Sequence, residues 1–321
     1  MRYIYILIFT LTCLTSCFKE EIPVQRKDRG PAISKTLEMG NTYDLTYYYS
    51  LNQDKVTASI DKFTWDLAFY GDSSKVHIKL NTGKSMYAYK TTKKDFKEPI
   101  DTNGFSQYRL NDFPCGTEDS MALSGILENN LVYVIDPGMD KNYQKETPIL
   151  LKAFKATDGY HIQYCNYNLS GFQSLVIPFN STKNYTLFQF KTSKSFDEPD
   201  TEEWEFMLTQ YQHVYYDPFQ TYSVVGCIIN PKMVEACIYN GNKKFEQVVL
   251  SDALNATYSS RADVIGFSWK YYDLNNNQYI IRPEKTYLIK HVNGKFFKLH
   301  FTGFYNNSGI KGSPTFEYEV L

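Results

Sequence analysis

The chain has 321 residues, with 34 Lys and Arg against 35 Asp and Glu. Because these charges nearly cancel, the sequence provides neither a basic field that could hold nucleic acid nor a strong acidic field. The length is sufficient for two domains of ordinary size, and the 28 Tyr and 22 Phe residues favour β-strands and hence an all-β fold.

The first expected element is a secretory signal peptide at residues 1–16. An apolar run from Ile4 to Leu14 is shorter than the roughly 20 residues that a bilayer-spanning helix needs. The run ends in LTSC, a sequence typical of a lipoprotein signal. We therefore expect lipidation of Cys17, with its acyl chains as the only membrane contact. A signal peptide cleaved elsewhere, or an N-terminal strand, is the alternative.

Residues 17–35 are expected to form a flexible tether, because they are charged and contain two prolines and a glycine. The segment FKEE that follows Cys17 resembles the short acidic tag that sends lipoproteins to the outer surface of some Gram-negative bacteria. A solvated tether whose charge carries no information is the alternative. The sequence thus predicts a lipid-anchored protein of the outer membrane, displayed on the cell surface.

Four blocks of sequence recur in one order, which predicts a tandem duplication. The segment FTWDLAFYG has its counterpart in EEWEFMLTQ, and their tryptophans, Trp65 and Trp204, are 139 residues apart. Further matching blocks precede and follow these segments at nearly the same offset, with the joint near Thr182. The expected units are two antiparallel β domains at residues 36–182 and 183–321.

Alternation of apolar and polar residues predicts strands in both units, for example at Val76–Leu80 and Phe297–Phe301. Asn293-Gly294 lies between two such runs and supplies the positive φ of a tight hairpin. A helical pattern is scarce, and 245–255 is the best candidate. Each motif tryptophan starts a strand whose alternate residues face a core, so we expect the indole to fill the end of that core.

The cysteines beyond the signal are Cys115, Cys165, Cys227 and Cys237, and none belongs to a C-x-x-C arrangement. A zinc site or a thioredoxin-like site is therefore not expected. Cys227 and Cys237 flank IINPKMVEA, which could turn back as a hairpin. A disulfide between them or a pair of buried thiols remains open.

Taken together, these blocks resemble the HmuY family. The shared elements are an aromatic strand, Trp-Asp-x-Ala-Phe, a Tyr-hydrophobic-x-Lys hairpin with a central Gly, a Tyr-Asn element, a Gly-x-x-Gly step and a closing Phe-x-Tyr strand. The resemblance is clearest at 287–321, and with WDLAF at 65–69 it spans nearly the whole mature chain. It implies an all-β fold, in two tandem HmuY-like units, and a surface lipoprotein of a Gram-negative bacterium.

The resemblance also implies a ligand and a partner. The best-known members of the family bind haem and pass it to an outer-membrane receptor, so haem, another porphyrin or another small hydrophobic ligand is expected in an apolar cleft within one unit or between the two. Members that use histidine place one axial ligand five residues after the motif tryptophan. That position holds Tyr70 in the first unit and Thr209 in the second. Tyrosinate can ligate ferric haem, so Tyr70 is a candidate, whereas bis-histidine ligation is not expected.

Three other residues are candidates for contact with the ligand. His213 lies in TQYQHVYYD, just beyond the second motif, where the family builds its pocket. Met86 and Met233 follow the first hairpin of each unit and could supply soft thioether ligands, although methionine also fills gaps in cores. The remaining histidines occupy strand or hairpin positions that alternate with apolar residues and are expected to face solvent: His77, His161, His291 and His300.

An enzyme is the least favoured class, because no nucleophile elbow, H-E-x-x-H or phosphate-binding glycine loop is present. The alternative to haem binding is a surface lipoprotein that binds glycans or proteins and has no haem site. Exposed tyrosine rings give flat amphipathic platforms suited to sugars, and sheet packing is the other explanation of such a cluster. The cluster in question is Tyr211, Tyr215, Tyr216 and Tyr222.

Overall fold

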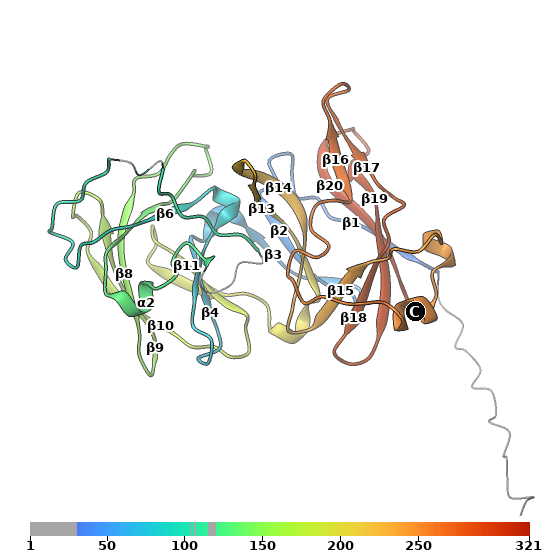
Figure 1. The fold of residues 1–321 in the computed structure, drawn as a ribbon, viewed down its shortest axis with the longest axis horizontal. Helices are drawn as coiled ribbons and strands as arrows, with labels where there is room; N and C mark the ends of the chain where they lie inside the picture. The colour runs from blue at the N-terminus through green and yellow to red at the C-terminus, as the bar shows by residue number, and fades with distance from the viewer. Residues whose placement is uncertain (1–30, 104, 106, 115–119) are drawn as a thin grey trace, which may run out of the picture. The chain divides into compact units, whose positions relative to one another are not determined.

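The computed structural model describes residues 31–103, 105, 107–114 and 120–321. The regular secondary structure of these residues consists almost entirely of antiparallel strands, which confirms the all-β prediction (Figure 1). Two short helices, α2 (Ile126–Asn129) and α3 (Leu250–Leu254), interrupt them. The expected signal peptide, Cys17, nearly all of the tether and Cys115 lie outside the described residues.

The described strands are arranged as two β-sandwiches. In the first sandwich, a five-stranded sheet of order β10-β9-β8-β7-β6 packs against a four-stranded sheet of order β12-β11-β4-β5. Their bounds are β4 Leu67–Tyr70, β5 Ile78–Leu80, β6 Tyr87–Lys90, β7 Tyr133–Asp136, β8 Ile149–Lys155, β9 Gly159–Asn166, β10 Gln173–Pro178, β11 Tyr185–Gln189 and β12 Lys194–Asp197.

The second sandwich has the same layers. Its sheets have the orders β1-β20-β19-β18-β15 and β14-β13-β2-β3, with the two-stranded ribbon β16-β17 beside them. Their bounds are β1 Ile33–Thr36, β2 Leu45–Ser50, β3 Lys55–Asp61, β13 Phe206–Tyr216, β14 Phe219–Ile229, β15 Val234–Ile238, β16 Lys270–Asp273, β17 Gln278–Ile281, β18 Tyr287–His291, β19 Phe296–Tyr305 and β20 Lys311–Val320.

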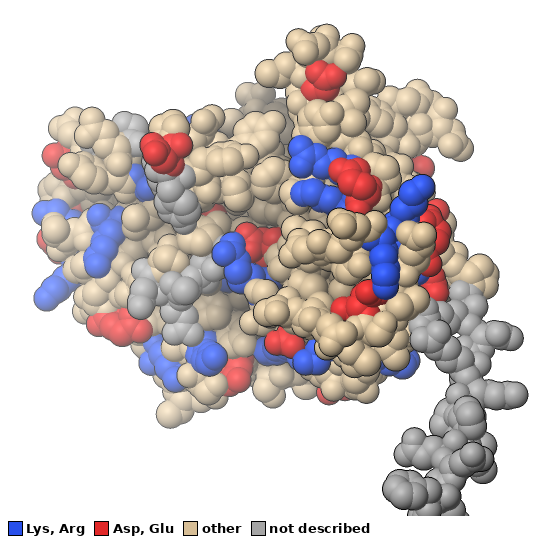
Figure 2. All heavy atoms as spheres, turned by 45° about the vertical axis from the view of Figure 1, so that its right-hand side comes forward, with Lys and Arg blue, Asp and Glu red and all other residues tan. Residues whose placement is uncertain are grey.

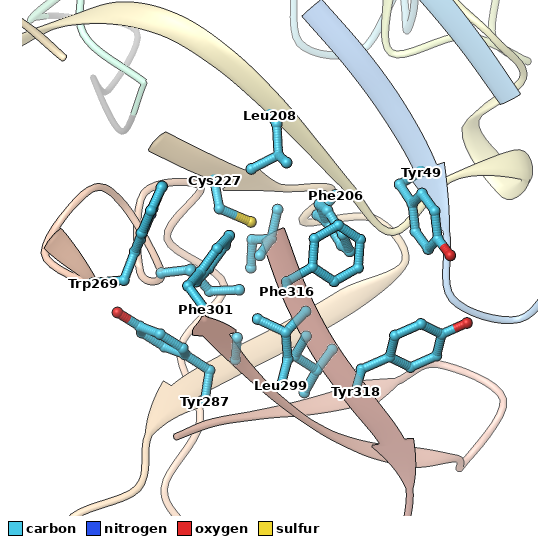
Figure 3. Close-up of a cluster of buried hydrophobic side chains, with 14 of the residues drawn as sticks. Tyr49, Phe206, Leu208, Cys227, Trp269, Tyr287, Leu299, Phe301, Phe316 and Tyr318 are labelled. Carbon is cyan, nitrogen blue, oxygen red and sulfur yellow. The ribbon is translucent and has the colours of Figure 1, made fainter. Parts of the chain in front are cut away.

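Aromatic side chains fill the core of the second sandwich (Figure 3). The rings of Tyr49 and Phe206, from the four-stranded sheet, lie 5.3 Å apart, and Phe316 of the opposite sheet packs edge-on against Phe206 at 5.4 Å. Trp269 stacks on Phe301 at 4.1 Å. Edge-to-face and offset ring pairs of this kind add to the free energy gained by burying the ring area. The many Tyr and Phe residues therefore stabilise the packing of the two sheets against each other.

The strand pairing crosses the joint that the repeat predicted near Thr182. Strand β2, from the first expected unit, pairs with β13 of the second, and β11, from the second, pairs with β4 of the first. The β2–β3 hairpin therefore belongs to the second sandwich and the β11–β12 hairpin to the first. As a result, neither sandwich coincides with one of the expected segments, 36–182 and 183–321. A repeat cannot predict this exchange, because both copies carry the same alternation and either motif strand fits either hairpin.

The acidic residue after each motif tryptophan holds the exchanged hairpin in place. Asp66 Oδ2 accepts a hydrogen bond from the backbone N–H of Phe190 at 2.8 Å, just beyond β11. Glu205 Oε2 accepts one from Leu51 N–H at 2.6 Å, just beyond β2. Both acids are buried, so each satisfies an amide that no water would reach. Asp66 and Glu205 thus make equivalent contacts in the two sandwiches.

Cys227 and Cys237 are free thiols, and so is Cys165. Cys227 lies on β14, which pairs with β13, whereas Cys237 lies on β15, which pairs with β18. The expected hairpin between them does not form, because the two strands belong to different sheets.

The charged side chains of the described residues are intermixed. Figure 2 shows Lys and Arg interspersed with Asp and Glu on the face in view, as the balanced composition predicts. Within the described ranges, no helix is long and apolar enough to cross a membrane, and no three His, Cys, Asp or Glu side chains are grouped as metal ligands.

Candidate functional site

A cavity of about 700 Å³ lies between the four-stranded sheets of the two sandwiches. This volume is within the range of small-molecule and cofactor sites. Alternation along β4 shows how the wall is made: Leu67 and Phe69 point into the first core, while Ala68 and Tyr70 line the cavity. The face of the sheet that is not used for its own core therefore becomes a wall of the cavity.

Strand β13 builds the opposite wall in the same way. Phe206 and Leu208 belong to the second core, while Met207 and Thr209 line the cavity. The two positions that lie five residues after a motif tryptophan, Tyr70 and Thr209, thus reach one cavity from opposite sheets.

Both motif tryptophans also line the cavity, although we expected each to fill the end of a core. Trp204 is buried and meets Tyr48 edge to face at 4.9 Å. Trp65 is half-buried. Each follows a 3₁₀ turn, Lys62–Thr64 or Thr201–Glu203, and precedes the first residue of the strand. Because each tryptophan lies outside the strand, the alternation that places the strand residues in the core does not apply to its indole ring.

An aromatic cluster surrounds Tyr70 on the wall formed by the first sandwich. The Tyr70 ring stacks on His77 at 4.5 Å, and His77 Nε2 lies 3.0 Å from the Tyr185 hydroxyl. Burial, together with the positive charge of Lys79, lowers the pKa of His77 to about 4. The imidazole is therefore neutral at physiological pH, which is the form that can bind a metal.

The sequence predicts that His77 faces solvent, but its side chain lines the cavity. His291 and His300, to which the same prediction applies, are also buried. The alternation at Val76–Leu80 correctly predicts which face of the strand is buried, since Ile78 and Leu80 are in the core. The polar face of this strand, however, points into the cavity instead of into bulk water. Alternation distinguishes the two faces of a strand, but it does not tell what covers the polar face.

Positive charge predominates around the cavity. The described residues of the wall include two acids, Asp112 and Glu198. The carboxylate of Asp112 accepts hydrogen bonds from the backbone N–H groups of Leu80 and Ala122, both at 2.6 Å. The other, Glu198, accepts a hydrogen bond from the Tyr48 hydroxyl at 2.8 Å, and burial raises the pKa of its carboxyl to about 7. The basic residues of the wall are Lys75, Lys79, Lys232 and Arg261.

The other candidates lie away from the lining of the cavity. Met86 is fully buried within the first core, and Met233 packs against the second. His213, on β13 beyond Thr209, packs against Phe267 with ring centroids 4.9 Å apart. Of the four haem-binding candidates, only Tyr70 is among the residues that line the cavity.

The tyrosine cluster is divided between two environments. Tyr211 is buried and lines the cavity, whereas Tyr215 and Tyr222 are exposed on the β13–β14 hairpin. The side chain of Tyr216 lies outside the described part of the structure.

Comparison with known proteins gives a family match and several solved structures. The family described as HmuY protein matches residues 42–318. The apo HmuY analog of Tannerella forsythia is 12% identical, with 92% of this chain and 98% of that chain covered and a TM-score of 0.26. Apo PinO from Porphyromonas gingivitis is 7% identical over 91% and 98% of the two chains, with a TM-score of 0.26. A candidate HmuY-like heme-binding protein from Bacteroides vulgatus is 18% identical over 41% and 82%, with a TM-score of 0.21. No curated protein matches this chain.

Proposed function

Because this chain belongs to the HmuY family, we propose that its central cavity binds haem or a related porphyrin. The observation that carries the proposal is the position of Tyr70, which stands where the resemblance places an axial ligand and lines a cavity of about 700 Å³. The aromatic walls suit a flat apolar ring system. The protein would act by binding and delivery and not by catalysis.

Tyr70 would hold ferric iron through its phenolate oxygen, since tyrosinate is an established haem ligand. His77 stacks on the Tyr70 ring at 4.5 Å, so both side chains reach the porphyrin from the same wall. Only one of them can take the axial position, and the other packs against it. Thr209, on the opposite wall, offers no comparable ligand, which favours ligation from one side.

The proposal includes a setting for this activity, which is based on the N-terminal sequence. A lipid anchor at Cys17 and the acidic segment after it support an outer-membrane protein displayed on the cell surface. From there, captured haem would pass to an outer-membrane receptor. Both the anchor and the receptor are parts of the proposal.

Haem titration of the lipid-free protein tests the site. We expect a saturable Soret band at micromolar haem, and a shift of that band in Tyr70→Phe. His161→Ala is the matched control, because His161 stacks on Phe154 at 4.9 Å and does not line the cavity. An unchanged band in Tyr70→Phe would exclude this residue as the ligand, and a featureless spectrum in the wild type would refute haem binding.

A glycan- or protein-binding surface is the second candidate function. It is favoured by one observation, the exposed rings of Tyr215 and Tyr222, whose exposed fractions are 45% and 47%. A glycan screen of the wild type and of Tyr215→Ala/Tyr222→Ala tests it. Binding that disappears in the double variant, together with a negative haem titration, would make this the better explanation.

A further inference from the structure

The two walls of the cavity carry different residue pairs at equivalent positions. Thr209 lies 139 residues after Tyr70, which is also the spacing of the two motif tryptophans. Tyr185 lies 139 residues after Thr46. All four side chains line the cavity. The repeat therefore places Tyr70 and Thr46 in the first copy and their counterparts, Thr209 and Tyr185, in the second.

The exchange of hairpins sorts these four residues by size. In the wall of the first sandwich, Tyr70 on β4 pairs across the strands with Tyr185 on β11, and their ring centroids are 5.5 Å apart. In the wall of the second, Thr209 on β13 and Thr46 on β2 are neighbours, with their hydroxyl oxygens 2.7 Å apart. One wall thus carries a pair of aromatic rings where the other carries a pair of small side chains.

The threonine pair satisfies its own hydrogen-bond donors. The Thr209 hydroxyl donates to the backbone carbonyl oxygen of Gln210 at 3.3 Å, so the Thr46 hydroxyl is the donor in the bond between the two threonines. Both hydroxyl protons are therefore used within the wall. A ligand can cover this pair without leaving a donor unpaired, which would be costly in a buried site.

The size of these two side chains decides how much room the cavity has. Alternation along β13 turns Thr209 away from the second core and toward the cavity. A tyrosine at this position, as in the other wall, would place a six-membered ring in the space that the ligand needs. The same holds for Thr46, which lines the cavity beside Thr209.

We propose that Thr46 and Thr209 determine the specificity of the cavity by their small size, because they leave room for a flat macrocycle between themselves and the Tyr70–Tyr185 pair. The inference rests on the proposed function and adds to it the residues that set the shape of the site. Selection by shape does not depend on iron, so it applies to porphyrins with and without the metal.

Iron-free protoporphyrin IX is the probe, because it has the shape of haem but needs no axial ligand. Quenching of tryptophan fluorescence reports its binding, since Trp65 and Trp204 line the cavity. Thr209→Phe should weaken binding about tenfold or more, because the added ring overpacks the occupied site. Thr209→Val is the matched control, since it removes the same hydroxyl without adding a ring, and it should bind as the wild type does.

Thr46→Phe and its control Thr46→Val repeat the comparison from β2, and the Soret band of haem should give the same order of affinities. Wild-type affinity in both Phe variants would overturn the inference and leave the proposed function standing. An equal loss in the Phe and Val variants would also overturn it, because the hydroxyl and not the size would then be decisive. If the wild type binds haem but not protoporphyrin IX, the iron selects the ligand and the inference fails. If the wild type binds neither, both proposals fail.

A crystal structure of the wild type with protoporphyrin IX decides the question if a Phe variant folds poorly. A macrocycle in contact with Thr46 and Thr209 would support the inference, and a macrocycle bound elsewhere would overturn it.

Discussion

Glu198 should make the folded protein less stable as pH rises from about 4.5 to about 7. The carboxyl is buried, and burial raises its pKa from the ordinary 4.5 to about 7. Between these values the folded protein retains a proton that the unfolded chain has released. The free energy of unfolding therefore falls as pH increases from about 4.5 to about 7 and is level above that range.

The size of the effect follows from the displacement of the pKa. A change from 4.5 to about 7 corresponds to about 3 kcal/mol between the two ends of the range. Glu198→Gln removes the titration, and its Oε1 can still accept the hydrogen bond that Tyr48 donates. Relative to the wild type, the variant should gain about 3 kcal/mol on going from pH 4.5 to pH 8.

Urea denaturation at several pH values measures this difference. The comparison uses the pH dependence and not the absolute free energy, because the new amide also changes the local hydrogen bonding. Glu203→Gln is the control, since Glu203 is exposed. Parallel pH profiles for the wild type and Glu198→Gln would show that the carboxyl titrates normally and would refute the reasoning.

Three further results are expected. Asp66→Ala should lose about 3 kcal/mol of stability in urea denaturation, because it removes one of the two carboxylates that pair with the buried Lys84 ammonium and leaves the backbone N–H of Phe190 without its acceptor; a loss no larger than that of Asp72→Ala, at a partly exposed position, would contradict this. Met86→Ala should lose about 2–5 kcal/mol by opening a hole in the first core, while its haem spectrum stays that of the wild type; an altered spectrum would place Met86 at the ligand. His77 should remain neutral in NMR titration from pH 8 down to pH 5, since its pKa is lowered to about 4. Protonation above pH 6 would show that the imidazole is not buried enough to lower its pKa.

Much of this fold could be predicted from local pattern. Alternation predicts the strands because one face of each is buried in a sandwich core, and the best helical candidate, 245–255, contains the short α3. The repeat could be detected because Trp65 and Trp204 each lie two residues before a strand, β4 or β13. The pattern does not indicate which strand pairs with which hairpin. Both motif strands have the same apolar face and an acidic residue just before it, so either strand could pair with either hairpin.

The sequence could predict a residue of the candidate site only where its position along a strand determines which face of the sheet it lies on. Tyr70 could be found by counting from the motif tryptophan, because strand geometry fixes which side of the sheet that residue faces. His77 could not, because the wall that encloses it combines β2 and β3, which precede it, with β13 and β14, which lie more than a hundred positions further along the chain. Met86 and His213 have side chains that can ligate a metal, but this property does not indicate whether a side chain lines a cavity or packs in a core.

The exchanged hairpins make the chain indivisible. A polypeptide cut at Thr182 would leave the fragment before the cut with β4 but without β11, and with a β2–β3 hairpin whose partner is missing. Neither fragment could complete its four-stranded layer, and each would expose unpaired backbone along a sheet edge. The two sandwiches therefore depend on each other, and the cavity between them can form only after both ends of the chain have been synthesised.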